Sequence, residues 1–220
     1  MHDLAIVIPA YRGGFLRQCL ASVNAQSDRR FHCYVFDDHS PDNIPSILEE
    51  FRDSLPLTYH RFGENMGRAS LAGHWNRCIR GTAGEPWIWL FSDDDLMHPH
   101  CVEAFYQEQE RHGLDPHCVY RFPMEVIDAD LNILGDSGEW PERLGSEDFL
   151  RLRLTFSIQS SVNEFIFSRQ SFEREGFPEF PLAWCSDDAA WISFTRKGEI
   201  RSLPSGLVGW RNSTANISSD

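Results

Sequence analysis

The chain has 220 residues and a mass of 25.4 kDa, which is enough for one substantial hydrophobic core. Its formal net charge of −13 and isoelectric point near 5.1 argue against nucleic acid or an anionic membrane surface as the main partner, because both attract clustered Lys and Arg. No apolar run approaches the roughly 18–20 residues that cross a bilayer, and no basic and then apolar segment opens the chain. We therefore expect a cytoplasmic protein.

The first half of the chain alternates between short apolar runs and segments with helical spacing of apolar residues. The pattern predicts strands at 4–8, 31–36, 57–62 and 86–91, and helices at 15–25, 44–51 and 69–80. Such an alternation indicates an α/β fold with right-handed crossovers and a mostly parallel sheet covered by helices. In such sheets, ligands bind outside the carboxyl ends of the strands.

The second half carries weaker signals. The pattern predicts a helix at 99–111, a strand at 118–127, a loop or hairpin at 128–142, a helix at 146–154, a strand leading into a short helix at 163–169, a helix at 188–197, and a polar loop from 209 onward. No repeat, low-complexity tract or linker divides the sequence, so we expect a single domain over residues 1–220.

The six cysteines are scattered and include no CxxC pair, so we expect buried free thiols rather than a zinc cluster or a disulfide framework.

An acidic cluster follows the fourth predicted strand, where the apolar run WIWLF leads into Asp93, Asp94 and Asp95. Adjacent carboxylates repel one another unless water or a cation relieves the repulsion. We therefore expect something electropositive to bind at this strand end. The alternative is that one or more of these aspartates cap the helix after Pro99, an alternative that applies most to Asp95.

Four stretches in sequence order resemble the nucleotide-sugar-binding half of inverting family 2 glycosyltransferases with the GT-A fold, a Rossmann-like α/β architecture. They are VIPAYRGGFLRQCLASVNAQ, VFDDHSPD, ENMGRASLAGHWNRC and WLFSDDDLMHP. The resemblance covers roughly residues 4–105, and SDDAAW at 186–191 matches more loosely. It implies a nucleotide-sugar-binding half at about 1–105 and an acceptor-binding half at about 106–220.

The resemblance also implies a nucleotide-activated sugar, most simply a UDP-sugar, a divalent cation (Mn²⁺ or Mg²⁺) as cofactor, and a DxD-type metal motif. Hard oxygen ligands at a strand end suit such an ion. The motif maps onto residues 93–95, with Asp94 as the first choice of metal ligand and Asp93 as the second. Where many members begin this motif with Asp, this chain has Ser92.

Residues that follow the four predicted strands are candidates for nucleotide-sugar binding. Carboxylates at Asp37 and Asp38 can accept hydrogen bonds from a base N–H or from ribose hydroxyls, and the guanidinium of Arg68 can meet a diphosphate. The further candidates of this class are Pro9, Tyr11 and Asp93. The alternatives are a turn with helix caps for DDHSPD, core packing for Tyr11 and an ordinary solvated side chain for Arg68.

Inversion requires a base that removes the acceptor proton opposite the leaving nucleotide. In the family this is commonly an acidic residue that opens a helix, and Asp188 or Asp187 fits that place, with Asp188 as the first choice. The alternative role for the pair is N-capping of the 188–197 helix. Trp184 and Trp191 flank the pair, and an aromatic face suits the apolar side of a sugar ring, although tryptophan at such spacing is more often core.

The expected activity is metal-assisted transfer of the sugar to an acceptor hydroxyl in the synthesis of a surface polysaccharide or glycan. The acceptor is expected to be a saccharide or lipid-linked glycan, with peripheral association at the inner face of the membrane. Two alternatives stay open: a sugar nucleotidyltransferase, which the single arginine in YRGG disfavours, and a non-catalytic nucleotide-sugar-binding protein.

Overall fold

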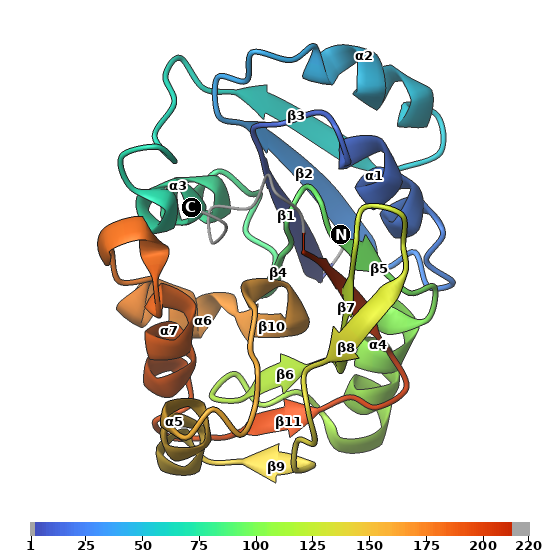
Figure 1. Ribbon diagram of the computed structural model, residues 1–220. Helices are drawn as coiled ribbons and strands as arrows, with labels where there is room; N and C mark the ends of the chain where they lie inside the picture. The colour runs from blue at the N-terminus through green and yellow to red at the C-terminus, as the bar shows by residue number, and fades with distance from the viewer. Residues whose placement is uncertain (1–2, 213–220) are drawn as a thin grey trace.

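The computed structural model describes residues 3–212. At its centre is an eight-stranded sheet with the strand order β3-β2-β1-β4-β10-β6-β11-β9 (Figure 1). The strands are β1 (Leu4–Ala10), β2 (Phe31–Asp37), β3 (Leu57–Arg61), β4 (Trp87–Leu90), β6 (Val119–Arg121), β9 (Arg143–Leu144), β10 (Phe165–Ser168) and β11 (Ile200–Ser202). The first four are mutually parallel, whereas β10 runs antiparallel to both β4 and β6. The expected α/β architecture is confirmed.

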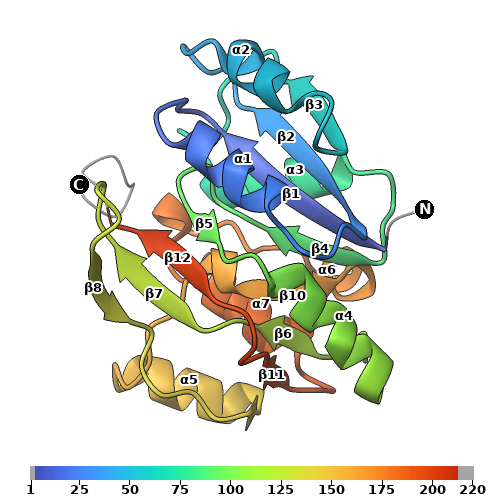
Figure 2. The same ribbon diagram turned by 90° about the vertical axis from the view of Figure 1, so that its right-hand side faces the viewer.

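Strand β1 is buried on both faces, which explains why its sequence is continuously apolar. Leu4, Ile6 and Ile8 belong to a core that includes residues of α1 (Leu16–Asn24), α2 (Ile44–Leu48) and α4 (Cys101–His112), while Ala5 and Val7 pack on the other face of the sheet. That second core includes residues of α3 (Leu71–Arg80), α6 (Arg169–Glu175) and α7 (Ser186–Phe194). Figure 2 shows α1 and α4 in front of the sheet and α7 behind it.

A smaller sheet lies beside the central one, in the order β5-β12-β7-β8. Its strands are β5 (Leu96–Met97), β7 (Met124–Ile127), β8 (Ile133–Asp136) and β12 (Val208–Arg211). This sheet was not expected. The single strand expected at 118–127 is two strands in different sheets, because the chain turns at Phe122 and Pro123.

Two further expectations about the second half need correction. The loop expected from residue 209 begins as strand β12, which pairs with β5 and β7, and residues 213–220 lie outside the described part of the chain. The helix expected at 188–197 is α7, which starts two residues earlier, so the aspartate pair lies inside its first turn. The helix expected at 146–154 is confirmed as α5 (Ser146–Leu154).

All six cysteines are free, as expected, and five are buried; Cys185 is exposed, contrary to the expectation for it. No helix within residues 3–212 is long and apolar enough to cross a membrane.

Candidate active site

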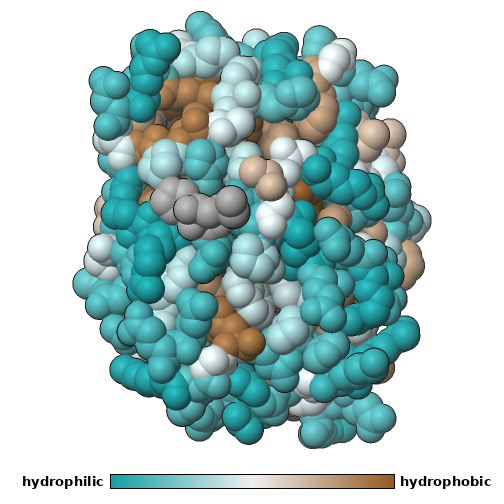
Figure 3. Space-filling view, turned by 180° about the vertical axis from the view of Figure 1, so that it is seen from behind, coloured by the Kyte–Doolittle hydropathy of each residue, from teal (hydrophilic) through white to brown (hydrophobic). Residues whose placement is uncertain are grey.

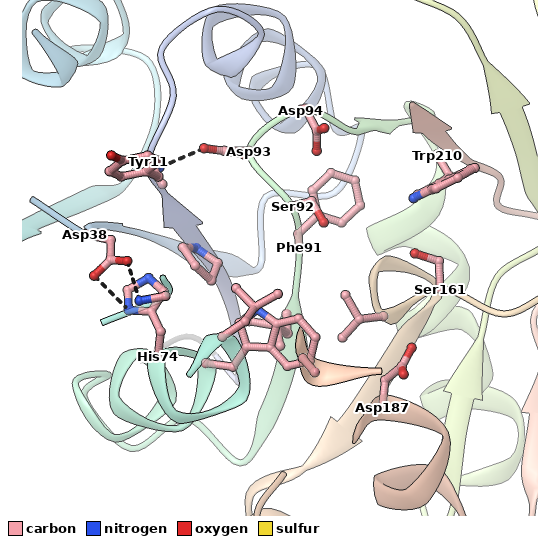
Figure 4. A pocket seen from close by; sticks show the side chains of 18 of the residues that line it. Tyr11, Asp38, His74, Phe91, Ser92, Asp93, Asp94, Ser161, Asp187 and Trp210 are labelled. Atoms are coloured by element: carbon pink, nitrogen blue, oxygen red, sulfur yellow. Dashed lines mark hydrogen bonds and ion pairs between the residues drawn. The ribbon is translucent and has the colours of Figure 1, made fainter. Parts of the chain in front are cut away.

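A cavity of about 970 Å³ opens at the carboxyl ends of β1, β2 and β4 (Figure 4). One side of it is formed by the segments that follow β1 and β4 and by α3, all from the first half of the chain. The other side is formed by residues 159–162, by residues 182–187 and by Trp210 of β12. The cavity therefore joins the two parts of the sequence that were expected to bind donor and acceptor.

The three aspartates at the end of β4 have two kinds of surroundings. Asp93 and Asp94 line the cavity. An oxygen of Asp93 accepts hydrogen bonds from the backbone N–H groups of Tyr11 (2.9 Å) and Arg12 (3.4 Å), which ties the end of β4 to the loop after β1. Burial raises the pKa of Asp93 to about 7, with the Asp94 charge adding to the shift, and burial also raises the pKa of Asp94.

Asp95 points elsewhere. Its two carboxylate oxygens accept hydrogen bonds from the Asn163 side chain (2.8 Å) and from the Arg211 backbone N–H (2.7 Å), and it does not line the cavity. It thus links the end of β4 to the segment before β10 and to β12. The metal role expected for Asp95 stays a prediction, and these contacts favour a structural role. Helix α4 is not capped by any of the aspartates, because His100 is its N-cap and makes no side-chain cap bond.

The donor set at the end of β4 fits a divalent cation that arrives with its substrate. Mg²⁺ in such sites is bound by one or two carboxylates together with substrate phosphates. Within residues 3–212, no group of three or more His, Cys, Asp or Glu side chains could hold a metal by itself. Asp94 lines the cavity, and the positive charge of Arg211 partly offsets the effect of burial on the pKa of its carboxylate.

The two aspartates at the end of β2, Asp37 and Asp38, also have different surroundings. Asp37 is fully buried and binds the Ser40 N–H, the Tyr59 hydroxyl and the Arg61 guanidinium, at 2.6, 2.6 and 2.8 Å. It does not line the cavity. The nucleotide-binding role expected for Asp37 stays a prediction, while its contacts join β2, the turn after it and β3.

Asp38 lines the cavity and is held by a second set of donors. Its carboxylate accepts hydrogen bonds from the Met66 N–H (2.9 Å) and the Gly67 N–H (2.8 Å), and from the Arg77 guanidinium. A Cβ at position 67 would lie 2.7 Å from an Asp38 oxygen, so only glycine allows this close approach. The turn formed by residues 65–68 therefore packs against the Asp38 carboxylate.

His74 Nδ1 lies 3.6 Å from Asp38 Oδ1, and His74 also lines the cavity. Burial lowers the pKa of His74 to about 4, so the imidazole is neutral near pH 7. Arg77 Nε donates to its Nδ1 at 3.0 Å. The sequence pattern did not single out His74, because its surroundings depend on a contact between α3 and the end of β2.

The other expected donor-side residues, Pro9, Tyr11 and Arg68, also line the cavity. Tyr11 is 42% exposed, so the alternative of core packing does not hold for it. Arg12, which sequence reasoning passed over, lines the cavity beside Tyr11. The side chains expected to bind a nucleotide sugar are thus brought together, except for Asp37.

Opposite the acidic cluster, Asp187 lines the cavity and Asp188 does not (Figure 4). The Arg153 guanidinium donates hydrogen bonds of 2.9–3.0 Å to both carboxylate oxygens of Asp188. Burial raises the pKa of Asp187 to about 7, and the Asp188 charge contributes in the same direction. Neither aspartate is the N-cap of α7, since Cys185 occupies that position.

The wall between these two acidic groups is built by residues that the sequence did not flag. Ser161 opens a turn in which Glu164 accepts a hydrogen bond from the Ser161 backbone N–H at 2.6 Å. The buried guanidinium of Arg121 bonds Glu164 at 2.6 Å and anchors this turn to β6. Trp210 faces the cavity from β12 in Figure 4. Of the two tryptophans expected near a sugar, Trp184 lines the cavity, and Trp191 is buried in the core.

The chain matches the family described as Glycosyl transferase family 2 over residues 5–174. An uncharacterized glycosyltransferase of Rickettsia typhi, RT0329, is 25% identical over 203 residues, which are 90% of this chain and 60% of that protein. The succinoglycan biosynthesis protein ExoW of Rhizobium meliloti is 31% identical over 121 residues, covering 52% of this chain and 36% of that protein.

Solved structures show the same fold. S. aureus TarS 1–349 in complex with UDP-GlcNAc superposes with a TM-score of 0.79 at 17% identity, covering 100% of this chain and 61% of that chain. GalNAc-T7 with UDP, GalNAc and Mn²⁺ superposes with a TM-score of 0.71 at 13% identity, covering 97% of this chain and 44% of that chain. The chain spans about 60% of the length of its Rickettsia relative and of TarS 1–349. With the family match and these folds together, the chain belongs to glycosyl transferase family 2 and has the GT-A fold.

Proposed function

We propose that this protein is an inverting glycosyltransferase that moves a sugar from a UDP-sugar to an acceptor hydroxyl. The observation that carries the proposal is that Asp93 and Asp94 line one side of a cavity and Asp187 lines the other side of the same cavity. Asp93 and Asp94 would hold a cation that stabilises the negative charge of a departing nucleotide. Asp187 offers a carboxylate that can accept a proton. The structures of TarS with UDP-GlcNAc and of GalNAc-T7 with UDP support UDP as the nucleotide.

The donor nucleotide is assigned to the side formed by the ends of β1 and β2. Tyr11 offers a ring and Asp38 a carboxylate for the base or ribose, and Arg68 and Arg12 offer positive charge for the diphosphate. The protein has a net charge of −13, so cationic side chains at this mouth offset the repulsion of an anionic donor. The first half of the chain is thus the donor half of the proposal.

Asp94 and Asp93 would hold a divalent cation together with the diphosphate of the donor. When bound, such an ion stabilises the negative charge that develops on the departing UDP. The protein contributes the fixed position of these carboxylates, since the Tyr11 and Arg12 N–H groups hold Asp93 in place. The raised pKa of both aspartates reflects the cost of burying two neighbouring charges, a cost that a cation offsets.

Asp187 is the proposed general base, in place of the first choice made from sequence, Asp188. The acceptor hydroxyl attacks the anomeric carbon, the bond from that carbon to the UDP oxygen breaks, and Asp187 takes the hydroxyl proton. Asp188 is occupied by Arg153 and serves to position the turn and to keep the pKa of Asp187 raised. A base whose pKa lies near 7 suits proton transfer at neutral pH.

The wider role proposed is the assembly of a surface polysaccharide or glycan. The partial match to ExoW, a succinoglycan biosynthesis protein, supports this role. A direct test incubates the protein with Mn²⁺, individual UDP-α-sugars and sugar acceptors, and follows UDP release and the anomeric proton of the product by NMR. The proposal expects a β-linked product, with UDP release well above that of Asp187→Asn. An α-linked product would contradict inversion.

A further inference from the structure

Helix α3 contacts both sides of the cavity. On the donor side, His74 of this helix lies against Asp38. On the other side, Asn76 of the same helix bonds the backbone of Phe177, where the segment that leads to Asp187 begins. Figure 4 shows His74 and Asp38 on one side of the cavity and Asp187 on the other. One helix therefore touches a group proposed for the donor and the segment that carries the proposed base.

The contact between Asn76 and Phe177 uses both backbone groups of Phe177. The Asn76 side chain donates a hydrogen bond to the Phe177 carbonyl at 2.8 Å and accepts one from the Phe177 N–H at 2.9 Å. An asparagine amide can do both, because it carries a donor and an acceptor. Asn76 is only 5% exposed, so water competes little for these hydrogen bonds. The contact fixes the path of the chain where it leaves α3.

The ring of Phe177 lies between α3 and α7. Its centroid is 5.6 Å from that of Trp75 on α3, and 5.6 and 5.9 Å from those of Trp191 and Phe194 on α7. These rings belong to the second core or pack against it, whereas the surface seen from behind in Figure 3 is mainly hydrophilic. Trp191 follows Asp187 by about one helical turn. Phe177 therefore packs α3 against the helix that carries the proposed base.

The segment between Phe177 and Asp187 has an unfavourable backbone. Leu182 (φ 56°), Ala183 (φ 56°) and Cys185 (φ 59°) all have the left-handed conformation, which is unfavourable for residues other than glycine. Such conformations persist only where the surrounding structure enforces them. The place of Asp187 therefore depends on contacts that this segment makes with the rest of the molecule.

A second contact joins α3 to the same segment. The Ser70 hydroxyl, at the N-cap of α3, donates a hydrogen bond to Glu179 at 2.6 Å and accepts one from the Gly73 N–H at 3.0 Å. The Glu179 carboxylate thus lies at the N-terminus of α3, where the helix dipole favours a negative charge. Figure 1 shows the orange turn before α7 beside α3. The segment is held to α3 at two points, Phe177 and Glu179.

We propose that Asn76 and Glu179 are positioning residues, which hold the proposed base in place relative to the bound donor. This inference rests on the proposed function and adds two residues to it. Neither side chain lines the cavity, so both act through the backbone of residues 177–187 and not on the substrate itself. Their loss should slow transfer without weakening nucleotide binding, because the turn of residues 65–68 still holds Asp38.

The test measures kcat with Mn²⁺ and the UDP-α-sugar and sugar acceptor that give the fastest UDP release with the wild type, alongside titration of UDP. Asn76→Ala should lower kcat about tenfold, because a small misplacement of a catalytic group is costly, while the Kd for UDP stays within about twofold. Glu179→Ala, a change at an exposed position, should lower kcat about fivefold. Glu179→Gln, which can still accept the hydrogen bond of Ser70, should restore most of the rate.

Gln26→Ala is the matched control for Asn76→Ala. Gln26 is 3% exposed, and its amide likewise bonds one backbone carbonyl, that of His98 (2.8 Å), and one backbone N–H, that of Val102 (3.1 Å). These contacts lie at the start of α4 and not at the segment of the base. Gln26→Ala should lower Tm to a similar degree as Asn76→Ala and leave kcat close to the wild-type value.

The inference is overturned if Asn76→Ala and Glu179→Ala turn over like the wild type, or if UDP affinity falls as much as kcat. It is also overturned if Gln26→Ala is as slow as Asn76→Ala, or if Glu179→Gln is as slow as Glu179→Ala. Should Asn76→Ala fail to fold, the two Glu179 variants decide the matter. A wild-type protein that releases UDP from no UDP-sugar would contradict the proposed function and the inference together, whereas fully active variants would contradict the inference alone.

Discussion

Arg153 and Asp188 form a bidentate ion pair, in which the guanidinium donates hydrogen bonds of 2.9–3.0 Å to both carboxylate oxygens. The pair joins the last turn of α5 to the first turn of α7. Its consequence is a division of labour between adjacent aspartates, because Asp188 is occupied while Asp187 faces the cavity. The assignment of the base follows from this contact rather than from the order of the residues in the sequence.

Replacing Asp187 by asparagine should reduce sugar transfer by about 10²–10⁴-fold, because the acceptor loses its proton acceptor. Affinity for UDP should stay within about twofold of the wild type, since the donor side is untouched. The measurement is UDP release alongside UDP titration. Asp188→Asn is the matched variant, and it should lose clearly less activity. Loss of turnover in Asp188→Asn with an active Asp187→Asn would show that the base is Asp188.

The rate of transfer should rise with pH through about 7 and then level off. A general base works only when it is ionised, and burial raises the pKa of Asp187 to about 7. The charged and titratable groups around it are Asp188, Arg153, Cys185 and Glu164. The measurement is kcat/KM from pH 5.5 to 9, with UDP affinity recorded at each pH. A profile that is already flat below pH 6 would contradict this prediction.

Replacing Gly67 by alanine should lower UDP affinity by about tenfold, roughly 1.4 kcal/mol. The new Cβ would lie 2.7 Å from an Asp38 oxygen, so the carboxylate or the turn must move. Gly63→Ala is the matched control, since a Cβ there meets nothing within 4 Å. Equal UDP affinity in the two variants would show that the position of Asp38 does not matter for the nucleotide.

Asp95→Ala should destabilise the fold. The substitution removes the hydrogen bonds that Asp95 accepts from the Asn163 side chain and the Arg211 backbone N–H, at a cost of about 1–3 kcal/mol each. For a chain of this size, we expect Tm to fall by about 5 °C or more. Exposed Asp130→Ala should change Tm by less than about 1 °C. If Asp95→Ala keeps its Tm but loses metal-dependent UDP binding, Asp95 is a metal ligand after all.

Asp94→Ala should remove the difference in UDP affinity between Mn²⁺ and EDTA, because Asp94 is the first-choice metal ligand of the proposal and lines the cavity. The Tm measured without metal should be unchanged or slightly higher, since the substitution removes a buried carboxyl group whose pKa is raised by burial. A variant that keeps the full effect of Mn²⁺ on UDP binding would exclude Asp94 as the ligand.

The parallel half of the fold and the gathering of its strand-end residues could be predicted from sequence. Local apolar patterns fix β1, β2, β3 and β4, and parallel pairing necessarily brings their carboxyl ends to one edge. The positions of Pro9, Tyr11, Asp38 and Asp93 at one cavity follow from that rule.

The roles of adjacent acidic residues could not be predicted, because they depend on contacts between segments far apart in the chain. Asp95 turns away toward Asn163, 68 residues later, and Asp188 is bound by Arg153, 35 residues earlier. The smaller sheet was missed for the same reason, since β5 has two residues and exists only through its pairing with β12. The place of Trp210 in the cavity follows from that pairing.

The central claim is that the cavity binds a UDP-sugar with a divalent cation, and isothermal titration of the wild-type protein tests it most directly. UDP, GDP and dTDP are each titrated with Mn²⁺ and with EDTA. The account predicts that UDP binds most tightly and that Mn²⁺ strengthens its binding by at least tenfold. Binding of none of the three nucleotides, or equal UDP affinity in Mn²⁺ and EDTA, would contradict it.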